Sequence, residues 1–213
     1  MINLGNVLIL GDSYSSFQNY IPNNYGFWYP NEDASKTDVS HVSQTWWWQL
    51  LDDTKSNLIL NDSWSGTTIC NTCRPTLDIK TSFVNRFEKL ANNCFFENND
   101  INTVFIFGGT NDSWIDSPVG DSMFSDWKEG DLLFVLPAVS YLFYKIKNII
   151  PKARIITIIN TDLKDVITEG IKKAAEYFEV EYLQLENISK QSGHPDIKGM
   201  KQIKDQIFEF LNE

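Results

Sequence analysis

Five short apolar runs recur along the chain, and residues that favour turns bound each of them. The runs are rich in Leu or β-branched residues and show little polar alternation. This is typical of strands in a parallel sheet that is covered on both faces. We predict buried strands at residues 6–11, 57–62, 103–109, 154–160 and 180–185.

Segments with helical spacing of apolar residues lie between and after these runs. We predict helices within residues 43–53, 79–91, 139–150, 163–178 and 197–211. Strands that alternate with helices predict an α/β sheet with right-handed crossovers. No internal repeat or linker interrupts the pattern, so we expect a single domain over residues 1–213.

Two long segments do not fit the alternation, namely residues 18–42 and 110–131. Both are polar and aromatic, and both come after a predicted strand, near the sheet edge where open α/β sheets place their ligand crevices. Exposed loops with incidental aromatic residues are the alternative. Whether either segment closes over a ligand is left open.

Composition narrows the class of partner. The formal net charge is −10, which argues against nucleic acid because that partner needs clustered Lys and Arg. The longest apolar stretch, 132–144, is interrupted by Pro137 and Ser140, so we expect no membrane span. The chain begins without a signal-peptide pattern. We expect either a cytoplasmic protein or a secreted or periplasmic one whose signal has been removed, and the oligomeric state is left open.

Three cysteines do not make a disulfide framework. Cys70 and Cys73 form a C-x-x-C pattern in "TICNTCRP". A redox site would need this pattern at a helix N-terminus, and a zinc site would need a second pair of ligands. Cys94 and the two histidines are scattered along the chain, so we interpret the pattern as incidental and keep a redox or metal site as the alternative.

Ser13, in "GDSY", directly follows the first predicted strand. A buried strand fixes the backbone there, and the hydroxyl is a candidate nucleophile. The alternative is that Ser13 caps a following helix, which serine does well.

His194 is the first candidate for the base that such a serine needs. It lies in "SGHPD", where Pro195 is expected to open the last helix and so hold the imidazole at a loop–helix junction. His41 is the other histidine, and it lies in an aromatic loop without such an anchor.

Gly66 and Asn111 are candidate donors to an oxyanion. Gly66 follows the second predicted strand and would allow close approach of its backbone N–H, and Asn111 follows the third strand and carries an amide donor. Each is an ordinary turn residue by itself. Together with Ser13 and His194, however, they are expected to converge on one rim of the sheet.

These four residues, in "GDSY", at Gly66, in "GGTND" and in "GHPD", stand in an order and spacing that resembles the SGNH hydrolase, or GDSL-type esterase, family. The resemblance covers nearly the whole chain. It implies a flavodoxin-like three-layer α/β/α fold, ester or deacetylation chemistry, and no metal or other cofactor. It also implies that Ser13 is the nucleophile and His194 the base, with an oxyanion hole from Ser13 N–H, Gly66 N–H and the Asn111 side chain.

One position departs from the family pattern. The family usually has an Asp three residues before the histidine, and this chain has Gln191 there. A Gln oxygen or a backbone carbonyl could fix the imidazole with less charge stabilisation than a carboxylate gives. Asp196 and Glu186 are possible substitutes, although Asp196 is expected to begin the last helix. The alternative function is a binding protein of the same fold that holds a glycan or ester without cleaving it.

Aromatic side chains in loops near the expected crevice suggest the substrate. Stacking on sugar faces would use them, so we expect a small-molecule or glycan ester with a short acyl group, acetyl being the first candidate. The alternative is packing. The residues are Tyr14, Trp28, Trp64, Trp114 and Trp127, of which Tyr14, Trp64 and Trp114 are the candidates for substrate contact.

Overall fold

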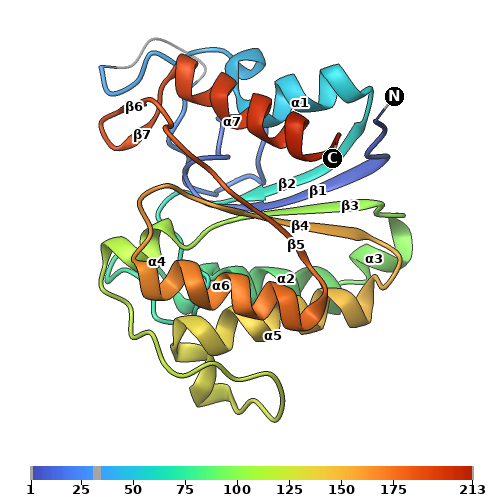
Figure 1. The fold of residues 1–213 in the computed structure, drawn as a ribbon, viewed down its shortest axis with the longest axis vertical. Coiled ribbons are helices and arrows are strands. Elements are labelled where there is room, and N and C mark those ends of the chain that lie inside the picture. Colours follow the sequence, from blue (N-terminus) through green and yellow to red (C-terminus); the bar gives the residue numbers. More distant parts are fainter. Residues whose placement is uncertain (1, 31–34, 213) are drawn as a thin grey trace.

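The structure is a computed structural model that describes residues 2–30 and 35–212. Five parallel strands form its central sheet (Figure 1), in the order β2-β1-β3-β4-β5. The strands are β1 (Asn6–Gly11), β2 (Asn57–Ser63), β3 (Thr103–Phe107), β4 (Arg154–Ile159) and β5 (Glu181–Gln184). The predicted five-stranded parallel sheet is thereby confirmed.

Helices cover both faces of the sheet and complete the three-layer α/β/α fold (Figure 1). On one face lie α1 (Trp46–Thr54) and α7 (Ile197–Phe210), and on the other lie α2 (Phe83–Asn92), α5 (Val135–Ile149) and α6 (Asp165–Phe178). Shorter helical segments connect them: η1 (Val42–Gln44), η2 (Ile79–Thr81), α3 (Phe95–Asn98), α4 (Thr110–Trp114) and η3 (Glu129–Leu133).

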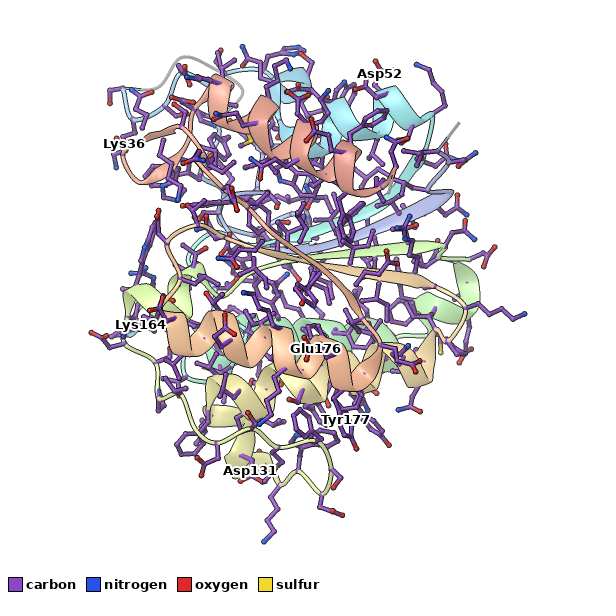
Figure 2. All side chains as sticks on the ribbon, viewed as in Figure 1. Lys36, Asp52, Asp131, Lys164, Glu176 and Tyr177 are labelled. Atoms are coloured by element: carbon purple, nitrogen blue, oxygen red, sulfur yellow. The ribbon has the colours of Figure 1, made fainter. Side chains whose placement is uncertain are left out.

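The strands are apolar throughout because both faces are packed. On β1, Val7 and Ile9 belong to the core under α1 and α7, whereas Leu8 and Leu10 belong to the core under α2, α5 and α6. Side chains fill both layers, and charged ones such as Asp52 and Lys164 lie at the outer surface (Figure 2). Burial on both faces therefore explains the absence of polar alternation in the sequence.

Two predicted helices begin with a 3₁₀ turn. The segment 43–53 divides at Thr45, whose hydroxyl accepts from Trp48 N, and the segment 79–91 divides at Ser82, which accepts from Asn85 N. In both cases a side-chain cap restarts the helix. The third predicted helix, 139–150, corresponds to α5, which begins earlier, at Val135. The helix can include Pro137 because this residue falls in its first turn, where proline is tolerated.

The described residues contain no helix with the length and apolarity that a membrane crossing requires.

A buried ion pair joins the carboxyl end of the sheet to α2. Arg86 and Asp62 are paired at 2.7 Å, and their side chains are 1% and 2% exposed. Arg86 also donates to the carbonyl of Gly11 at 3.0 Å and to that of Thr81 at 2.9 Å. This one guanidinium therefore holds the ends of β1 and β2 together.

Removing one partner of this buried ion pair should strongly destabilise the protein. We expect Arg86→Met to lower the free energy of unfolding by about 3–5 kcal/mol, because Asp62 is left buried and unpaired. Urea unfolding monitored by tryptophan fluorescence measures the change.

Two further variants make the test of the ion pair specific. Lys201→Met breaks an exposed pair with Asp205 and should cost less than about 1 kcal/mol. The double variant Asp62→Leu/Arg86→Met should be more stable than Arg86→Met, because no charge is left unpaired. Equal losses of unfolding free energy in Arg86→Met and Lys201→Met would contradict the stabilising role of the buried Arg86–Asp62 pair.

Candidate active site

Ser13 lies on a tight turn just beyond β1. Ser15 N donates to the Asp12 carbonyl and Ser16 N to the Ser13 carbonyl, both at 3.3 Å. The Asp12 carboxylate accepts from Tyr14 N at 3.0 Å and so braces the turn. No helix begins between residues 12 and 30, so the alternative that Ser13 caps a following helix is wrong.

His194 faces Ser13 from a hairpin that the sequence did not predict. Strands β6 (Lys190–Gln191) and β7 (His194–Pro195) pair antiparallel around the turn residues Ser192 and Gly193. Both turn residues have positive φ, 52° and 77°, as a type I′ turn requires. His194 Nε2 lies 2.9 Å from Ser13 Oγ, and the two residues are 5% and 2% exposed.

The other imidazole nitrogen determines the tautomer. His194 Nδ1 lies 3.1 Å from the carbonyl oxygen of Ser192. A carbonyl only accepts, so Nδ1 carries the proton and Nε2 presents its lone pair to Ser13. This arrangement suits Nε2 for accepting the proton of the Ser13 hydroxyl.

Two tyrosine hydroxyls hold the hairpin by hydrogen bonds to its backbone carbonyls. Tyr14 Oη donates to the Gly193 carbonyl at 2.7 Å, and Tyr29 Oη donates to the Pro195 carbonyl at 2.9 Å. Both tyrosines are fully buried, so each hydroxyl depends on its carbonyl partner.

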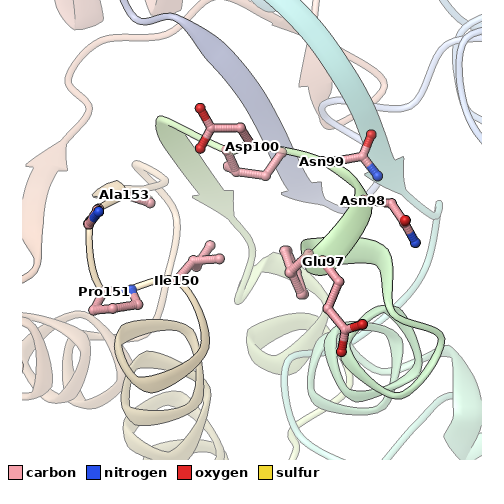
Figure 3. Close-up of a pocket in the computed structure, with 10 residues that line it drawn as sticks. Glu97, Asn98, Asn99, Asp100, Ile150, Pro151 and Ala153 are labelled. Atoms are coloured by element: carbon pink, nitrogen blue, oxygen red, sulfur yellow. The ribbon is translucent and has the colours of Figure 1, made fainter.

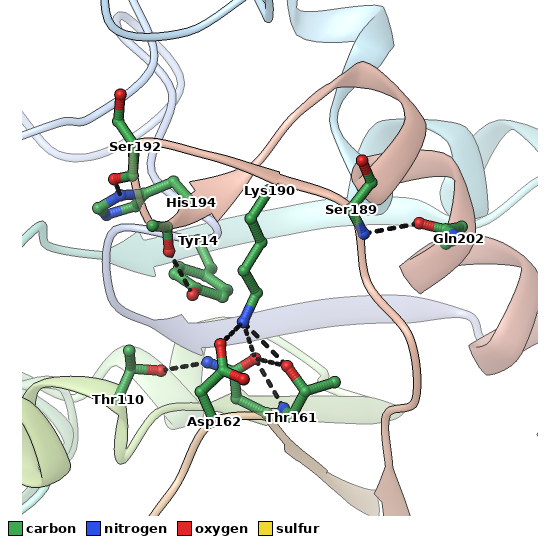
Figure 4. Close-up of polar contacts among 11 residues, drawn as sticks. Tyr14, Thr110, Thr161, Asp162, Ser189, Lys190, Ser192, His194 and Gln202 are labelled. Carbon is green, nitrogen blue, oxygen red and sulfur yellow. Dashed lines mark hydrogen bonds and ion pairs between the residues drawn. The ribbon is translucent and has the colours of Figure 1, made fainter.

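Lys190 anchors the first strand of the hairpin beyond the end of β4. It donates to Asn160 and Thr161 and forms an ion pair with Asp162 (Figure 4). Together with the two tyrosines, this anchor fixes the Ser192 carbonyl relative to the sheet.

Aromatic rings enclose the imidazole. The Trp28 indole stacks on it, with ring centroids 3.6 Å apart and an interplanar angle of 10°. Trp114 meets it edge-on at 5.5 Å. Burial lowers the pKa of His194 to about 4, and the positive charges of Lys190 and Arg74 act in the same direction. The imidazole is therefore neutral at pH 7.

Asn111 lies near the turn that carries Ser13, and Gly66 is next to a residue that Asn111 contacts. Asn111 is in α4, directly beyond β3, and its Nδ2 donates to the Thr67 carbonyl at 3.0 Å. The same Nδ2 lies 3.4 Å from Asp12 Oδ2. Gly66 precedes Thr67 and has a φ of 87°, which favours glycine. The sequence-predicted residues Ser13, Gly66, Asn111 and His194 are thus gathered at the carboxyl edge of the sheet.

Neither Gln191 nor Asp196 orients His194 among the described residues. Gln191 pairs with His194 in the hairpin ladder, but its side chain is exposed and no hydrogen bond joins it to the imidazole. Asp196 caps α7 by accepting from Gly199 N at 2.7 Å, and its other oxygen accepts from Ser189 Oγ at 2.6 Å. Glu186 is exposed as well. The Ser192 carbonyl is the group that orients the imidazole in this part of the chain.

The tryptophan candidates differ in their distance from the base. Trp28 and Trp114 contact His194, and Trp114 is 42% exposed. Trp64 is half-buried and stacks on Tyr25 at 4.1 Å. Of the predicted substrate contacts, Trp114 is therefore the one that is both exposed and next to the base.

The expectation that Tyr14 contacts substrate is corrected. The turn at Asp12 directs its side chain inward, where it packs edge-on against Phe107 and is fully buried. Its role is to hold the hairpin.

Trp127 lies away from the site. It packs against Tyr141 and Tyr144 of α5 and Phe178 of α6. The expectation that it borders the crevice is corrected, because the later part of segment 110–131 packs along the outer side of these helices, as the contacts of Trp127 show. Phe124 of the same segment likewise packs against Phe178.

The cysteines are all free. Cys70 is buried, and its backbone N–H donates to Asp112 Oδ1. Burial raises the pKa of the Cys70 thiol well above its usual range, as expected for an inert structural cysteine. The described part of the chain holds no cluster of three or more His, Cys, Asp or Glu residues that would suit a metal ion.

Sequence reasoning missed two contacts at the candidate site. Arg74 donates to Asn111 Oδ1 from Nε at 3.3 Å and from Nη2 at 3.0 Å. The Ser192 carbonyl supports His194. The "SG" dipeptide before His194 is a turn signal that could have indicated the hairpin, whereas no local pattern marks Arg74.

A surface pocket of about 440 Å³ lies at the opposite end of the sheet (Figure 3). It is formed by residues 96–101, which lead into β3, and residues 150–153, which lead into β4. It contains neither serine nor histidine, so Ser13 and His194 lie elsewhere.

The low pKa of His194 can be measured directly. We expect its imidazole to stay neutral down to pH 5 and to titrate near pH 4 in an NMR pH titration, with the exposed His41 as the second histidine signal. Trp28→Ala should raise the pKa of His194 towards about 6.5, because it admits water to the ring. A pKa near the ordinary histidine value in the unmodified protein would contradict the buried geometry.

Comparisons with known proteins agree with this geometry. The family model described as GDSL-like Lipase/Acylhydrolase matches residues 5–211. A solved GDSL-like lipase from Bacteroides ovatus has 37% identity and a TM-score of 0.90, with 99% of each chain covered. One from Bacteroides uniformis has 33% identity and a TM-score of 0.89, with 98% of this chain and 95% of that chain covered.

More distant structures share the fold. An acetyl xylan esterase from the rumen bacterium Butyrivibrio proteoclasticus is 18% identical with a TM-score of 0.65, covering 100% of this chain and 64% of that one. No curated protein matches the sequence. On the family match and the two Bacteroides structures, the chain belongs to the GDSL-like lipase/acylhydrolase family, and its general activity is that of an ester hydrolase.

Proposed function

We propose that the protein is a serine esterase that hydrolyses a short-acyl carboxylic ester, with Ser13 as nucleophile and His194 as general base. The observation that carries the proposal is the contact of 2.9 Å between Ser13 Oγ and His194 Nε2, combined with the donation from Nδ1 to the Ser192 carbonyl. Nucleophile, base and orienting group are thus arranged in the order that acyl transfer requires.

The reaction proceeds in two halves. Ser13 Oγ attacks the ester carbonyl while His194 Nε2 takes the hydroxyl proton, and the C–O bond to the alcohol breaks as His194 returns that proton to the leaving oxygen. A water molecule then attacks the acyl-enzyme, His194 takes a proton from it, and the acid leaves as Ser13 regains its proton. The N–H groups of Ser13 and Gly66 and the Asn111 amide would bind the oxyanion.

The His194 environment fits a dyad rather than a triad. A carbonyl supplies part of the negative charge that an Asp would supply, so the imidazolium formed in the reaction is stabilised less. With its pKa lowered to about 4, His194 is mostly neutral above about pH 5. The acid limb of the activity profile should therefore lie well below neutral pH.

A short acyl group on a carbohydrate is the substrate class that we propose. Ser13 is only 2% exposed, which leaves little room for a long acyl chain beside it. Trp114, 42% exposed next to His194, offers a face on which a sugar ring could stack. Structures with the same fold include the acetyl xylan esterase described above.

The nucleophile is tested with p-nitrophenyl acetate and a fluorophosphonate probe. Ser13→Ala should lower kcat by about 10³-fold or more while the unfolding temperature stays close to that of the parent. Peptide mapping should find the probe on Ser13. Unchanged turnover in Ser13→Ala would rule out the mechanism, and glycan binding without probe labelling would favour the binding-protein alternative.

Gln191→Ala serves as the matched control for His194→Ala. Because the Gln191 side chain is exposed and not bonded to the imidazole, kcat should change by less than about twofold, whereas His194→Ala should lose about 10³-fold or more. Comparable losses in the two variants would mean that Gln191 supports the base.

The carbohydrate assignment is tested by comparing two substrates. Trp114→Ala should raise KM for acetylated xylo-oligosaccharides by about tenfold, the loss of one stacking contact, and should change KM for p-nitrophenyl acetate much less. An equal effect on both substrates would count against sugar stacking at Trp114 while leaving the esterase mechanism intact.

A further inference from the structure

We propose that Arg74 is a positioning residue that orients and polarises the Asn111 amide for binding of the oxyanion. The inference rests on the proposed function, because it concerns how the same site receives a developing negative charge. It begins from two hydrogen bonds that join Arg74, in the connection after β2, to Asn111, in helix α4 after β3.

The contacts of Asn111 allow only one orientation of its amide. Arg74 donates two hydrogen bonds to Oδ1, from Nε and Nη2, and a guanidinium has no acceptor. On the other side Nδ2 donates to the Thr67 carbonyl, which has no donor. A flipped amide would set donor against donor and acceptor against acceptor, so the two partners fix which atom is nitrogen.

One hydrogen of Nδ2 is left for a substrate. The first is taken by the Thr67 carbonyl at 3.0 Å, and within residues 2–30 and 35–212 the second has only Asp12 Oδ2 at 3.4 Å, a long and weak contact. This second hydrogen faces Asp12, the residue before Ser13. An oxyanion formed on a Ser13 adduct could take it with little competition.

The guanidinium also strengthens the donor. The positive charge of a guanidinium hydrogen-bonded to Oδ1 draws electron density from the amide nitrogen, which makes its N–H groups stronger donors. Such polarisation is larger where water is excluded. Asn111 is only 1% exposed. The charge of Arg74 therefore acts on the oxyanion through a single rigid amide.

Arg74 is placed next to the second proposed oxyanion donor as well. A Cβ on Gly66 would lie 3.7 Å from Arg74 Cδ, so the side chain of Arg74 passes beside Gly66 on its way to Asn111. Two other roles would use the same position: direct binding of an anionic group on the substrate, and simple anchoring of the loop. The following experiment separates all three.

The kinetic test is a double-mutant cycle with p-nitrophenyl acetate. Arg74→Met should lower kcat by roughly tenfold or more with KM changed less than about threefold, because an oxyanion donor acts in the transition state. Arg74→Lys should retain an intermediate kcat, since it restores the charge but not both hydrogen bonds. Lys80→Met, which removes an exposed charge from the same connection, should leave kcat unchanged.

The decisive comparison is in the Asn111→Ala background. If Arg74 acts through Asn111, Arg74→Met should cost less than about twofold further there. An equally large loss in both backgrounds would overturn the proposal in favour of loop anchoring. A loss confined to KM would overturn it in favour of substrate binding.

A second measurement does not depend on turnover. The side-chain amide of Asn111 should give two resolved, slowly exchanging NMR signals, which move and exchange faster in Arg74→Met but not in Lys80→Met. Unchanged Asn111 signals in Arg74→Met would overturn the proposal. If the parent protein shows no esterase activity, the proposed function fails, and the NMR result still decides whether Arg74 holds Asn111.

Discussion

The arrangement of the site depends on one hydrogen bond, from His194 Nδ1 to the carbonyl of Ser192. It determines which imidazole nitrogen bears the proton, and hence whether Nε2 can accept a proton from the nucleophile. A backbone carbonyl can do this only if the backbone is held still. The hydroxyls of Tyr14 and Tyr29 and the amine of Lys190 provide that restraint on a hairpin with only two residues in each strand.

Burying so many polar groups at one edge of the sheet requires compensation. Burial raises the pKa of Asp12 to about 7, even though backbone N–H donation and the nearby Arg86 act against the shift. Burial also raises the pKa of Asp112, whose oxygens accept from the N–H groups of Ile69 and Cys70. These carboxyls serve as braces for loops. The cost of desolvating them is offset by the hydrogen bonds that fix the turn at residues 12–16, which carries Ser13, and the loop after β2.

Much of the fold could be predicted from sequence because the strands are nearly continuous apolar runs separated by helical periods. Ser13, Gly66, Asn111 and His194 could be named because each stands beyond a strand or beside the last helix, and parallel strands bring such positions to one edge. Contacts between loops could not be predicted in the same way. Arg74 and Asn111 are 37 positions apart. No sequence periodicity predicts such a contact, because the two residues meet only once the sheet has brought the segments after β2 and β3 together. The hairpin escaped prediction because its strands are too short to show alternation.

The lack of a carboxylate at position 191 becomes understandable in this setting. Gln191 stands opposite His194 in the hairpin ladder, but its side chain is exposed and, within the described residues, makes no hydrogen bond to the imidazole, so the buried ring has no carboxylate from this position. The structure instead surrounds the ring with Trp28, Trp114 and Tyr14, which exclude water and favour the neutral base. In such surroundings a negative charge would need its own compensation. In the proposed mechanism the neutral carbonyl at Nδ1 and the Arg74 guanidinium therefore have separate roles, since the first sets the tautomer of His194 and the second would strengthen binding of the oxyanion by Asn111.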